Sequence, residues 1–349
     1  MRSFVDLDST FAGQPRELGA LLSRIDTSRG RERLFEDQTP ELLARLSEHA
    51  RIASITASNA IEGVLVGSER AERIAEGSGR FRNRNERELA GYRDAIDMLT
   101  RSGSKEQLSV PFVLHLHRLL FHHSNGRGGH LKSDPNLIVS YESGRREVVF
   151  EPPPPEQAEF LLSELIARYN QSQLDGRTHQ LVLIGALVLD LLAIHPVADG
   201  NGRLARLITT HEMLGQSYGV ARYVSIEQRM YESKNAYYAS LHESQRGWHE
   251  GRHSIWPWVG YLARIVADAY EDFEQRIAGA GASKGTKHER VREHILEQAP
   301  PEFRRRDVEL AFPGVSAATI RLVLNELRDK GLIRSDGAGP AARWRRLSP

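Results

Sequence analysis

The sequence predicts a mainly α-helical protein that carries one β-hairpin and ends in a small unit of helices and strands. Three observations support this fold class. Residues 179–194 are apolar on almost every side, residues 137–151 form two β-prone runs around Glu-Ser-Gly, and a Gly/Ser-rich stretch at 279–287 precedes a change in composition. A helix that is apolar all round is usually buried at the centre of a domain, so residues 179–194 mark the core.

Breaker residues bound each of these elements. Pro152 to Pro155 follow the hairpin, and Pro196 follows the apolar segment. That segment is shorter than the roughly 20 residues that cross a membrane, and it contains Asp190. We therefore expect a soluble core helix and no membrane span. Glycines at 200 and 202 then allow a turn into a second helix from Arg203 to Leu214.

The turn between these two helices concentrates chemically active side chains. Residues 195 to 206 read His-Pro-Val-Ala-Asp-Gly-Asn-Gly-Arg-Leu-Ala-Arg. Glycines at a helix N-terminus let backbone N–H groups point into one concavity, where the helix dipole also favours anions. Arg203 and Arg206 lie three apart on one helical face and can donate to phosphate oxygens. Asp199 is a hard oxygen ligand suited to Mg²⁺, and His195 can accept a proton from a hydroxyl. A plain helix-loop-helix with solvated arginines is the alternative, but six fixed identities at set spacing rarely coincide.

This stretch resembles the motif of the Fic family, His-x-Phe-x-Asp/Glu-Gly-Asn-Gly-Arg-x-x-Arg, whose members mostly transfer AMP from ATP to hydroxyl side chains of proteins. Val197 stands where the family usually has Phe, which we expect to keep the chemistry and to loosen the packing under the loop. The resemblance implies ATP as substrate, Mg²⁺ as cofactor, and a protein target with an exposed hydroxyl, self-modification included. It implies His195 as general base, Asp199 as Mg²⁺ ligand, Gly200, Asn201 and Gly202 as phosphate cradle, and Arg203 and Arg206 as holders of the outer phosphates.

Two further regions fit the resemblance. The hairpin at 137–151 is similar to the family's flap, whose exposed edge, here Val148, Val149 and Phe150, would pair with the backbone of the target. An ordinary hairpin is the alternative. Within residues 229–245, Tyr237, Tyr238, Leu241 and Gln245 resemble the helix that lines the family's adenine pocket. Tyrosine pairs in helices also occur in cores, so both interpretations stay open.

Ser58-Asn59-Ala60-Ile61-Glu62-Gly63 resembles the family's inhibitory pattern Ser/Thr-x-x-x-Glu-Gly/Asn. Ser58 and Glu62 lie four apart on one helical face, and Gly63 is a helix stop. The resemblance implies that Glu62 pairs with Arg206 and keeps it from the γ-phosphate. We therefore expect an inhibitory helix on the N-terminal side of the catalytic core in the same chain.

Composition is compatible with a cytoplasmic enzyme. The 349 residues carry a net charge of +1 and no cysteine, which argues against a dominant polyanion-binding surface and excludes disulfides and thiolate metal sites. Charged residues occur within Met1 to Asp6, before any apolar run, so we expect no signal peptide. We also expect a homodimer. His115, His117, His122, His123 and His130 do not share one helical face, so a zinc site there is disfavoured.

The C-terminal part has a different character. Helical patterns at 288–298, 305–312 and 316–330, followed by Gly331-Leu332-Ile333-Arg334 and a Gly-rich loop to Trp344, outline a winged helix. Residues 284–349 hold 14 Lys and Arg against 9 Asp and Glu. Its third helix carries Arg321, Arg328 and Lys330 but also Glu326 and Asp329, so both DNA and protein contacts stay open.

We therefore expect an N-terminal helical region at 1–89 with the inhibitory helix, a Fic core at 90–280, a linker at 281–287 and a winged helix at 288–349. Two functions remain. One is a self-inhibited protein AMP transferase, and the other is a DNA-binding regulator whose Fic core senses a nucleotide. The histidine, carboxylate and both arginines favour the enzyme, because a sensor needs no base.

Overall fold

The computed structural model describes residues 2–5, 13–36, 40–101, 106–124, 128–142, 145–281, 287–337 and 342–347. The predicted turn at 143–144, most of the predicted linker (282–286) and the loop at 338–341 lie outside these residues. The elements as far as the hairpin are η1 (Arg2–Phe4), α2 (Arg16–Glu36), α3 (Pro40–Ile61), α4 (Ser68–Ala75), α5 (Arg84–Arg101), α6 (Val110–Leu120), β1 (Ile138–Glu142) and β2 (Arg145–Phe150). After it follow α7 (Pro155–Asp175), α8 (Gln180–Ile194), α9 (Asn201–Gly215), α10 (Val220–Tyr223), α11 (Ile226–Glu232), α12 (Lys234–Gln245) and α13 (Trp256–Gly281).

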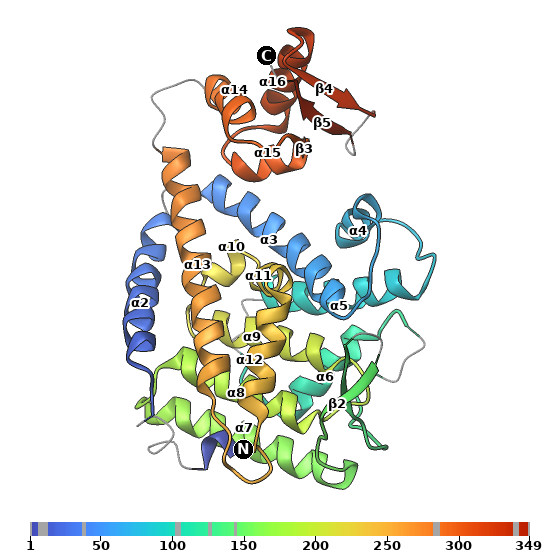
Figure 1. Cartoon of the computed structure of the whole chain (residues 1–349), viewed down its shortest axis with the longest axis vertical. Helices are drawn as coiled ribbons and strands as arrows, with labels where there is room; N and C mark the ends of the chain where they lie inside the picture. The colour runs from blue at the N-terminus through green and yellow to red at the C-terminus, as the bar shows by residue number, and fades with distance from the viewer. Residues whose placement is uncertain are drawn as a thin grey trace.

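Helix α8 is the centre of the helical body, as its apolar surface predicts. It packs against α7, α9, α12 and α13, and almost all its residues are fully buried (Figure 1). Its one charged residue, Asp190, is inaccessible to solvent. The carboxylate accepts hydrogen bonds from Ser3 N at 3.0 Å, Ser3 Oγ at 2.7 Å and Trp248 Nε1 at 2.7 Å, which offset the cost of burying it. Within the described residues, no helix is both long and apolar enough to cross a membrane.

The predicted hairpin forms, with β1 and β2 antiparallel and Tyr141 opposite Arg146. The register shifts between Ile138 and Val139, and a shift of this kind bends and twists a ribbon. Strand β2 contacts α12, and the hairpin lies at the side of the helical body, on the right in Figure 1.

Two helix boundaries differ from the prediction. Residues 229–245 do not form one helix, because Ser233 (φ −111°, ψ 34°) leaves the helical conformation and separates α11 from α12. The Ser233 hydroxyl donates to Arg229 O at 2.7 Å, a local bond that competes with helix continuation. Helix α9 begins at Asn201, two residues before Arg203, since Gly200 (φ 84°) caps it in a left-handed conformation.

Helix α3 begins near the unit formed by the C-terminal residues and runs to the middle of the helical body (Figure 1). It packs against α5, α10 and α11. The helix ends at Ile61, and Gly63 has φ 76°, which favours glycine and lets the chain turn away. Glu62 therefore stands immediately after the last turn of α3.

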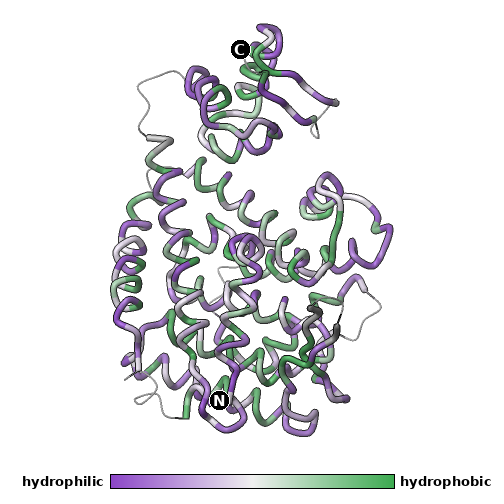
Figure 2. Tube along the Cα trace, viewed as in Figure 1, coloured by the Kyte–Doolittle hydropathy of each residue, from purple (hydrophilic) through white to green (hydrophobic). Residues whose placement is uncertain are grey.

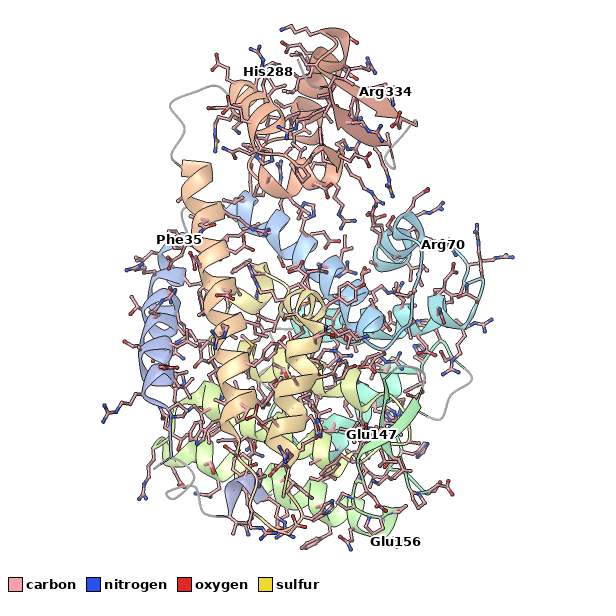
Figure 3. All side chains as sticks on the ribbon, in the orientation of Figure 1. Phe35, Arg70, Glu147, Glu156, His288 and Arg334 are labelled. Carbon is pink, nitrogen blue, oxygen red and sulfur yellow. The ribbon has the colours of Figure 1, made fainter. Side chains whose placement is uncertain are left out.

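The C-terminal unit, residues 287–347, has its own hydrophobic cluster and a hydrophilic strand surface (Figure 2). It contains α14 (Lys287–Glu297), β3 (Glu302–Arg304), α15 (Arg305–Ala311), α16 (Ala317–Asp329), β4 (Ile333–Asp336) and β5 (Arg343–Arg346), with an antiparallel sheet in the order β3-β5-β4. His288 and Arg334 of this unit lie near one end of the molecule, far from Glu147 of the hairpin, which lies in the other half (Figure 3). The helix positions agree with the predicted patterns within one residue. The division of the chain into four segments stays a prediction.

The C-terminal unit touches α3 and α4, the two helices that flank Glu62. Arg45 Nη1 on α3 donates to Pro313 O and Val315 O, both at 2.7 Å. Arg304 Nη1 donates to Ser68 Oγ at 2.9 Å, and Arg306 forms an ion pair with Glu72 on α4.

Candidate active site

One cavity of about 1070 Å³ brings together most of the residues singled out in the sequence. It is bounded by the end of α3, the start of α5, the hairpin, the 195–203 loop and α12. The predicted site residues that line it are Glu62, Val148, Val149, His195, Asp199, Gly200, Asn201, Gly202, Arg203, Tyr237, Tyr238, Leu241 and Gln245. Ser58, Gly63, Phe150 and Arg206 are not part of the lining. Phe150 instead faces a neighbouring cavity and packs against Trp248 and His249.

His195 terminates α8 in a left-handed conformation, with φ 49° and ψ 59°. Its Nδ1 lies 3.1 Å from Leu192 O, and a carbonyl only accepts, so Nδ1 carries the proton and Nε2 is the basic nitrogen. Burial, together with the nearby Lys132 ammonium, lowers the pKa of His195 to about 4. The ring is therefore neutral at pH 7 and able to accept a proton through Nε2.

The loop after His195 closes on itself through Asn201. The Asn201 amide donates to Val197 O at 2.7 Å, and its Oδ1 accepts from Val197 N at 3.1 Å. Val197 is completely buried beneath the loop, in the position of the family's Phe. His117 on α6 holds the next part of the loop, since its Nδ1 accepts from Gly129 N and its Nε2 donates to Asp199 O at 3.1 Å. The sequence did not single out His117 for this contact, because nothing local links it to residue 199.

Arg206 is held by the segment that the sequence predicts to be inhibitory. Its Nη2 donates to Glu62 Oε1 at 2.7 Å and to Ser58 O at 2.9 Å, and its Nε donates to Ser58 Oγ at 2.8 Å. Arg206 is 2% exposed, whereas the Glu62 side chain is 32% exposed toward the cavity. Burial opposes ionisation of Glu62, but the charge of Arg206 and its hydrogen bond outweigh this effect and lower the pKa of the carboxyl. The pair is therefore ionic at neutral pH.

Arg203 has a partner that sequence reasoning missed. Its Nη1 donates to Glu88 Oε2 on α5 at 2.7 Å, and both side chains are only 3% exposed. The guanidinium also lies over the Phe121 ring at 5.5 Å and contacts Asn59 Oδ1 at 3.4 Å. No spacing rule connects Glu88 with Arg203, which are 115 residues apart.

Both arginines keep one buried donor free. Among the described residues, Arg203 Nε and Arg206 Nη1 have no hydrogen-bond partner. An unpaired buried N–H of a cationic group is costly, so an acceptor that enters beside Arg203, which lines the cavity, would be stabilised there. Phosphate oxygens match a guanidinium in charge and geometry.

Asp199 is the candidate metal ligand at the mouth of the cavity. Its side chain is 61% exposed, and its nearest cation is Arg84 Nη2 at 3.6 Å from Oδ2. Mg²⁺ usually binds one or two carboxylates and completes its shell with phosphate oxygens and water. The accessible Asp199 carboxylate, in the cavity that Arg203 also lines, fits that coordination.

The structure also gathers Asp94, His122 and His123 away from this cavity, with ligand atoms within 4.8 Å of one another. Asp94 comes from α5, so the histidine spacing alone did not indicate the cluster. Arg93 donates to Asp94 Oδ1 through two nitrogens, at 2.9 and 2.6 Å, and His123 Nε2 lies 2.6 Å from Oδ2. The carboxylate is thus already neutralised by a protein cation, and we assign no metal to this cluster.

A comparison with protein families finds a match for the central segment of the chain. Residues 107–213, which contain α6, α8, the 195–206 loop and most of α9, match the family model described as Fic/DOC family. In sequence, this segment is similar to the Fic/DOC family. No curated protein matches the chain.

Solved structures extend the likeness beyond that segment. A Fic family protein from Desulfovibrio desulfuricans is 20% identical, with a TM-score of 0.63, and the alignment covers 96% of this chain and 97% of that one. A Fic domain containing signalling protein from Bacteroides thetaiotaomicron is 21% identical (TM-score 0.62; 75% and 99% covered). Fic-1 from C. elegans is 21% identical (TM-score 0.59; 76% and 73% covered). At these identities the comparisons establish the fold, a Fic fold with a two-strand hairpin and a small C-terminal sheet.

Proposed function

We propose that this protein transfers AMP from ATP to hydroxyl side chains of proteins, and that Glu62 holds it in a restrained state. The Fic/DOC match covers the residues that would carry out the chemistry. The observation that carries the proposal is the pair of unpartnered buried donors, Arg203 Nε and Arg206 Nη1. Arg203 lines the cavity together with His195 and Asp199, and Arg206 lies behind it, bound to the cavity residue Glu62. Two cationic donors, a neutral imidazole and one carboxylate are the groups that nucleotidyl transfer requires.

In the proposed reaction, a target hydroxyl attacks the α-phosphorus of ATP. The hydroxyl proton passes to Nε2 of His195, and the bond to the β-phosphate breaks to release pyrophosphate. Arg203 and Arg206 stabilise the negative charge of the outer phosphates, and backbone N–H groups at Gly200 to Gly202 receive the inner ones. A bound Mg²⁺, held by Asp199, would neutralise phosphate charge. Proton transfer of this kind is typically worth about 10²–10⁴-fold in rate.

The remaining cavity residues would bind the base and the target. Tyr238 and Leu241 on α12 offer an apolar surface beside Gln245, which suits a purine. The exposed Val148 edge of the hairpin would pair with an extended segment of the target, which needs little sequence specificity.

The restraint would act through competition. The Glu62 carboxylate uses the Arg206 donor that a γ-phosphate would otherwise occupy. A Cβ atom at Gly202 would lie 2.3 Å from Glu62 Oε1, so the carboxylate rests directly on the phosphate cradle. ATP in its productive position and Glu62 in this position would exclude each other.

The C-terminal unit, which we propose to be a winged helix, would serve docking in preference to DNA binding. Several basic side chains on its outer face are paired within the unit: Arg328 with Asp329, Lys330 with Glu326, and Arg345 with Glu302. Internal pairing leaves fewer charges for phosphates.

An experiment on two variants, Glu62→Gly and Glu62→Gly/His195→Ala, distinguishes the enzyme hypothesis from the sensor hypothesis. Each is incubated with ATP and Mg²⁺, and AMP incorporation into the chain and into a lysate is measured by mass spectrometry. We expect incorporation by the first protein, none by the second, and ATP affinities within a few-fold of each other. Equal incorporation by both would remove His195 from the mechanism, and ATP binding without incorporation by either would favour the sensor.

A further inference from the structure

The turn that presents His195 is supported from outside by two residues, Lys132 and Asn136. The last carbonyls of an α-helix have no partner within the helix. At the end of α8, Lys132 Nζ donates to Ile194 O at 3.1 Å, and Lys132 N donates to Pro196 O at 2.9 Å. Asn136 Nδ2 donates to His195 O at 3.3 Å and to Val197 O at 3.0 Å.

These bonds engage four successive carbonyls, from Ile194 to Val197. His195 lies among them with φ 49°, a conformation that non-glycine residues adopt rarely and that surrounding contacts must impose. The imidazole direction follows from this backbone, since Nδ1 contacts Leu192 O one turn back. Loss of the hydrogen bonds from Lys132 and Asn136 would therefore let both the backbone of His195 and its imidazole ring change orientation.

Lys132 is an unusual choice for a purely structural bond. Its side chain is buried, and burial lowers the pKa of its ammonium to about 8. Its described hydrogen-bond partners are neutral oxygens, Ile194 O and Asn136 Oδ1 at 2.9 Å. A buried ammonium without a carboxylate partner is costly, although the C-terminal end of a helix favours it. Neither Lys132 nor Asn136 lines the cavity, so neither touches substrate.

We propose that Lys132 and Asn136 are positioning residues that hold Nε2 of His195 in line with the attacking hydroxyl. This inference rests on the proposed function, in which His195 is the general base. Because the two side chains act through His195 and not on ATP, their loss lowers kcat and leaves the KM for ATP nearly unchanged. Displacement of a catalytic group by about 1 Å can cost roughly 10²-fold in rate.

Asn136→Asp is the sharpest variant. It keeps the size of the side chain and the oxygen that accepts from Lys132, but it replaces the amide donor with a second oxygen that repels His195 O and Val197 O. Asn170→Asp is the matched control, because Asn170 Nδ2 also donates to a backbone carbonyl, Leu108 O at 3.0 Å, outside the cavity. Lys132→Met removes the ammonium, and Lys132→Arg restores a donor at the same position.

All variants are made in the Glu62→Gly protein, and kcat, the KM for ATP and the Tm are measured. We expect Asn136→Asp and Lys132→Met to lower kcat about 10- to 100-fold with KM within about threefold, Lys132→Arg to recover most of the loss, and Asn170→Asp to match the parent. Unchanged kcat in a folded Asn136→Asp protein overturns the proposal, as does an equal loss in Asn170→Asp. If Lys132→Met does not fold, Asn136→Asp, which keeps Lys132 paired, decides alone. An inactive Glu62→Gly parent would contradict the proposed function instead.

Discussion

Arg206 and Glu62 form an ion pair at 2.7 Å across 144 residues of chain, at the boundary between the core and the cavity. The arginine is buried and also bonded to Ser58, whereas a third of the carboxylate side chain is open to the cavity. Removal of Glu62 therefore leaves Arg206 in place, because Ser58 still holds its Nε and Nη2. The arginine would then offer its free donors to a phosphate.

The thermal stability of the protein should depend on the ion pair between Glu62 and Arg206. Glu62→Gly leaves a buried guanidinium short of one charged partner, so we expect a lower Tm than in the wild type. ATP with Mg²⁺ replaces that partner, and the ligand-induced rise in Tm should be larger for Glu62→Gly than for the wild type. Differential scanning calorimetry with and without the nucleotide measures both shifts. A larger rise in the wild type would mean that Glu62 does not compete with ATP.

The pH dependence should reveal the environment of His195. Its pKa is lowered from 6.5 to about 4, so the neutral, basic form persists as pH falls through 6. A histidine with the ordinary pKa would retain only about a quarter of its neutral form at pH 6. We expect the AMP incorporation rate of Glu62→Gly at pH 6 to stay within about twofold of its rate at pH 7.5. An acid midpoint near 6.5 would contradict the buried position of the ring.

Removal of the Arg84 side chain should lower the Mg²⁺ concentration that the reaction requires. Its Nη2 lies 3.6 Å from the Asp199 carboxylate, and its exposure of 74% limits the strength of the pair. In the Glu62→Gly protein, Arg84→Ala should lower the Mg²⁺ concentration at half-maximal rate by about two- to threefold. Arg82→Ala, an exposed arginine of the same segment, controls for the loss of charge. A higher Mg²⁺ requirement in Arg84→Ala would show that Arg84 assists phosphate binding.

The contacts of the C-terminal unit should influence the restraint. Arg45 and Arg306 join that unit to α3 and α4, which flank Glu62. Replacing both with Ala should raise the activity of the wild type by about 2- to 30-fold and leave the Glu62→Gly protein unchanged. Arg321→Ala, on the exposed face of α16, is the control. A rise in activity of the same size in the wild type and in the Glu62→Gly protein would show that these contacts do not act through Glu62.

The sequence predicts those parts of the candidate site whose residues are close together in the chain. The 195–206 stretch contains its own turn, cap and arginines, and the hairpin and α8 follow from local patterns. Glu62 and Arg206 were paired only through the resemblance to Fic proteins, and the structure brings them into contact. Glu88, His117, Lys132 and Asn136 could not be found in this way, because each acts through a contact with a residue 59 or more positions away.

The break at Ser233 has a different cause. Residues 229–245 were expected to form one helix through their resemblance to the helix that lines the family's adenine pocket, and they carry no proline or glycine that would indicate a break. A serine hydroxyl bonded to Arg229 O ends α11, and the contact of its oxygen with Tyr261 OH at 2.8 Å ties the break to α13. Tertiary contacts of this kind override local propensity.

The most direct test of the account is AMP incorporation, followed by intact mass at saturating ATP and Mg²⁺, for the wild type, Glu62→Gly, Glu62→Asp and Glu62→Gly/Arg206→Ala. We predict low incorporation by the wild type, a marked rise in Glu62→Gly, a smaller rise in Glu62→Asp because the shorter carboxylate still reaches Arg206 in part, and a return to a low level in the double variant. Equal incorporation by the wild type and Glu62→Gly would contradict the central claim that Glu62 restrains Arg206.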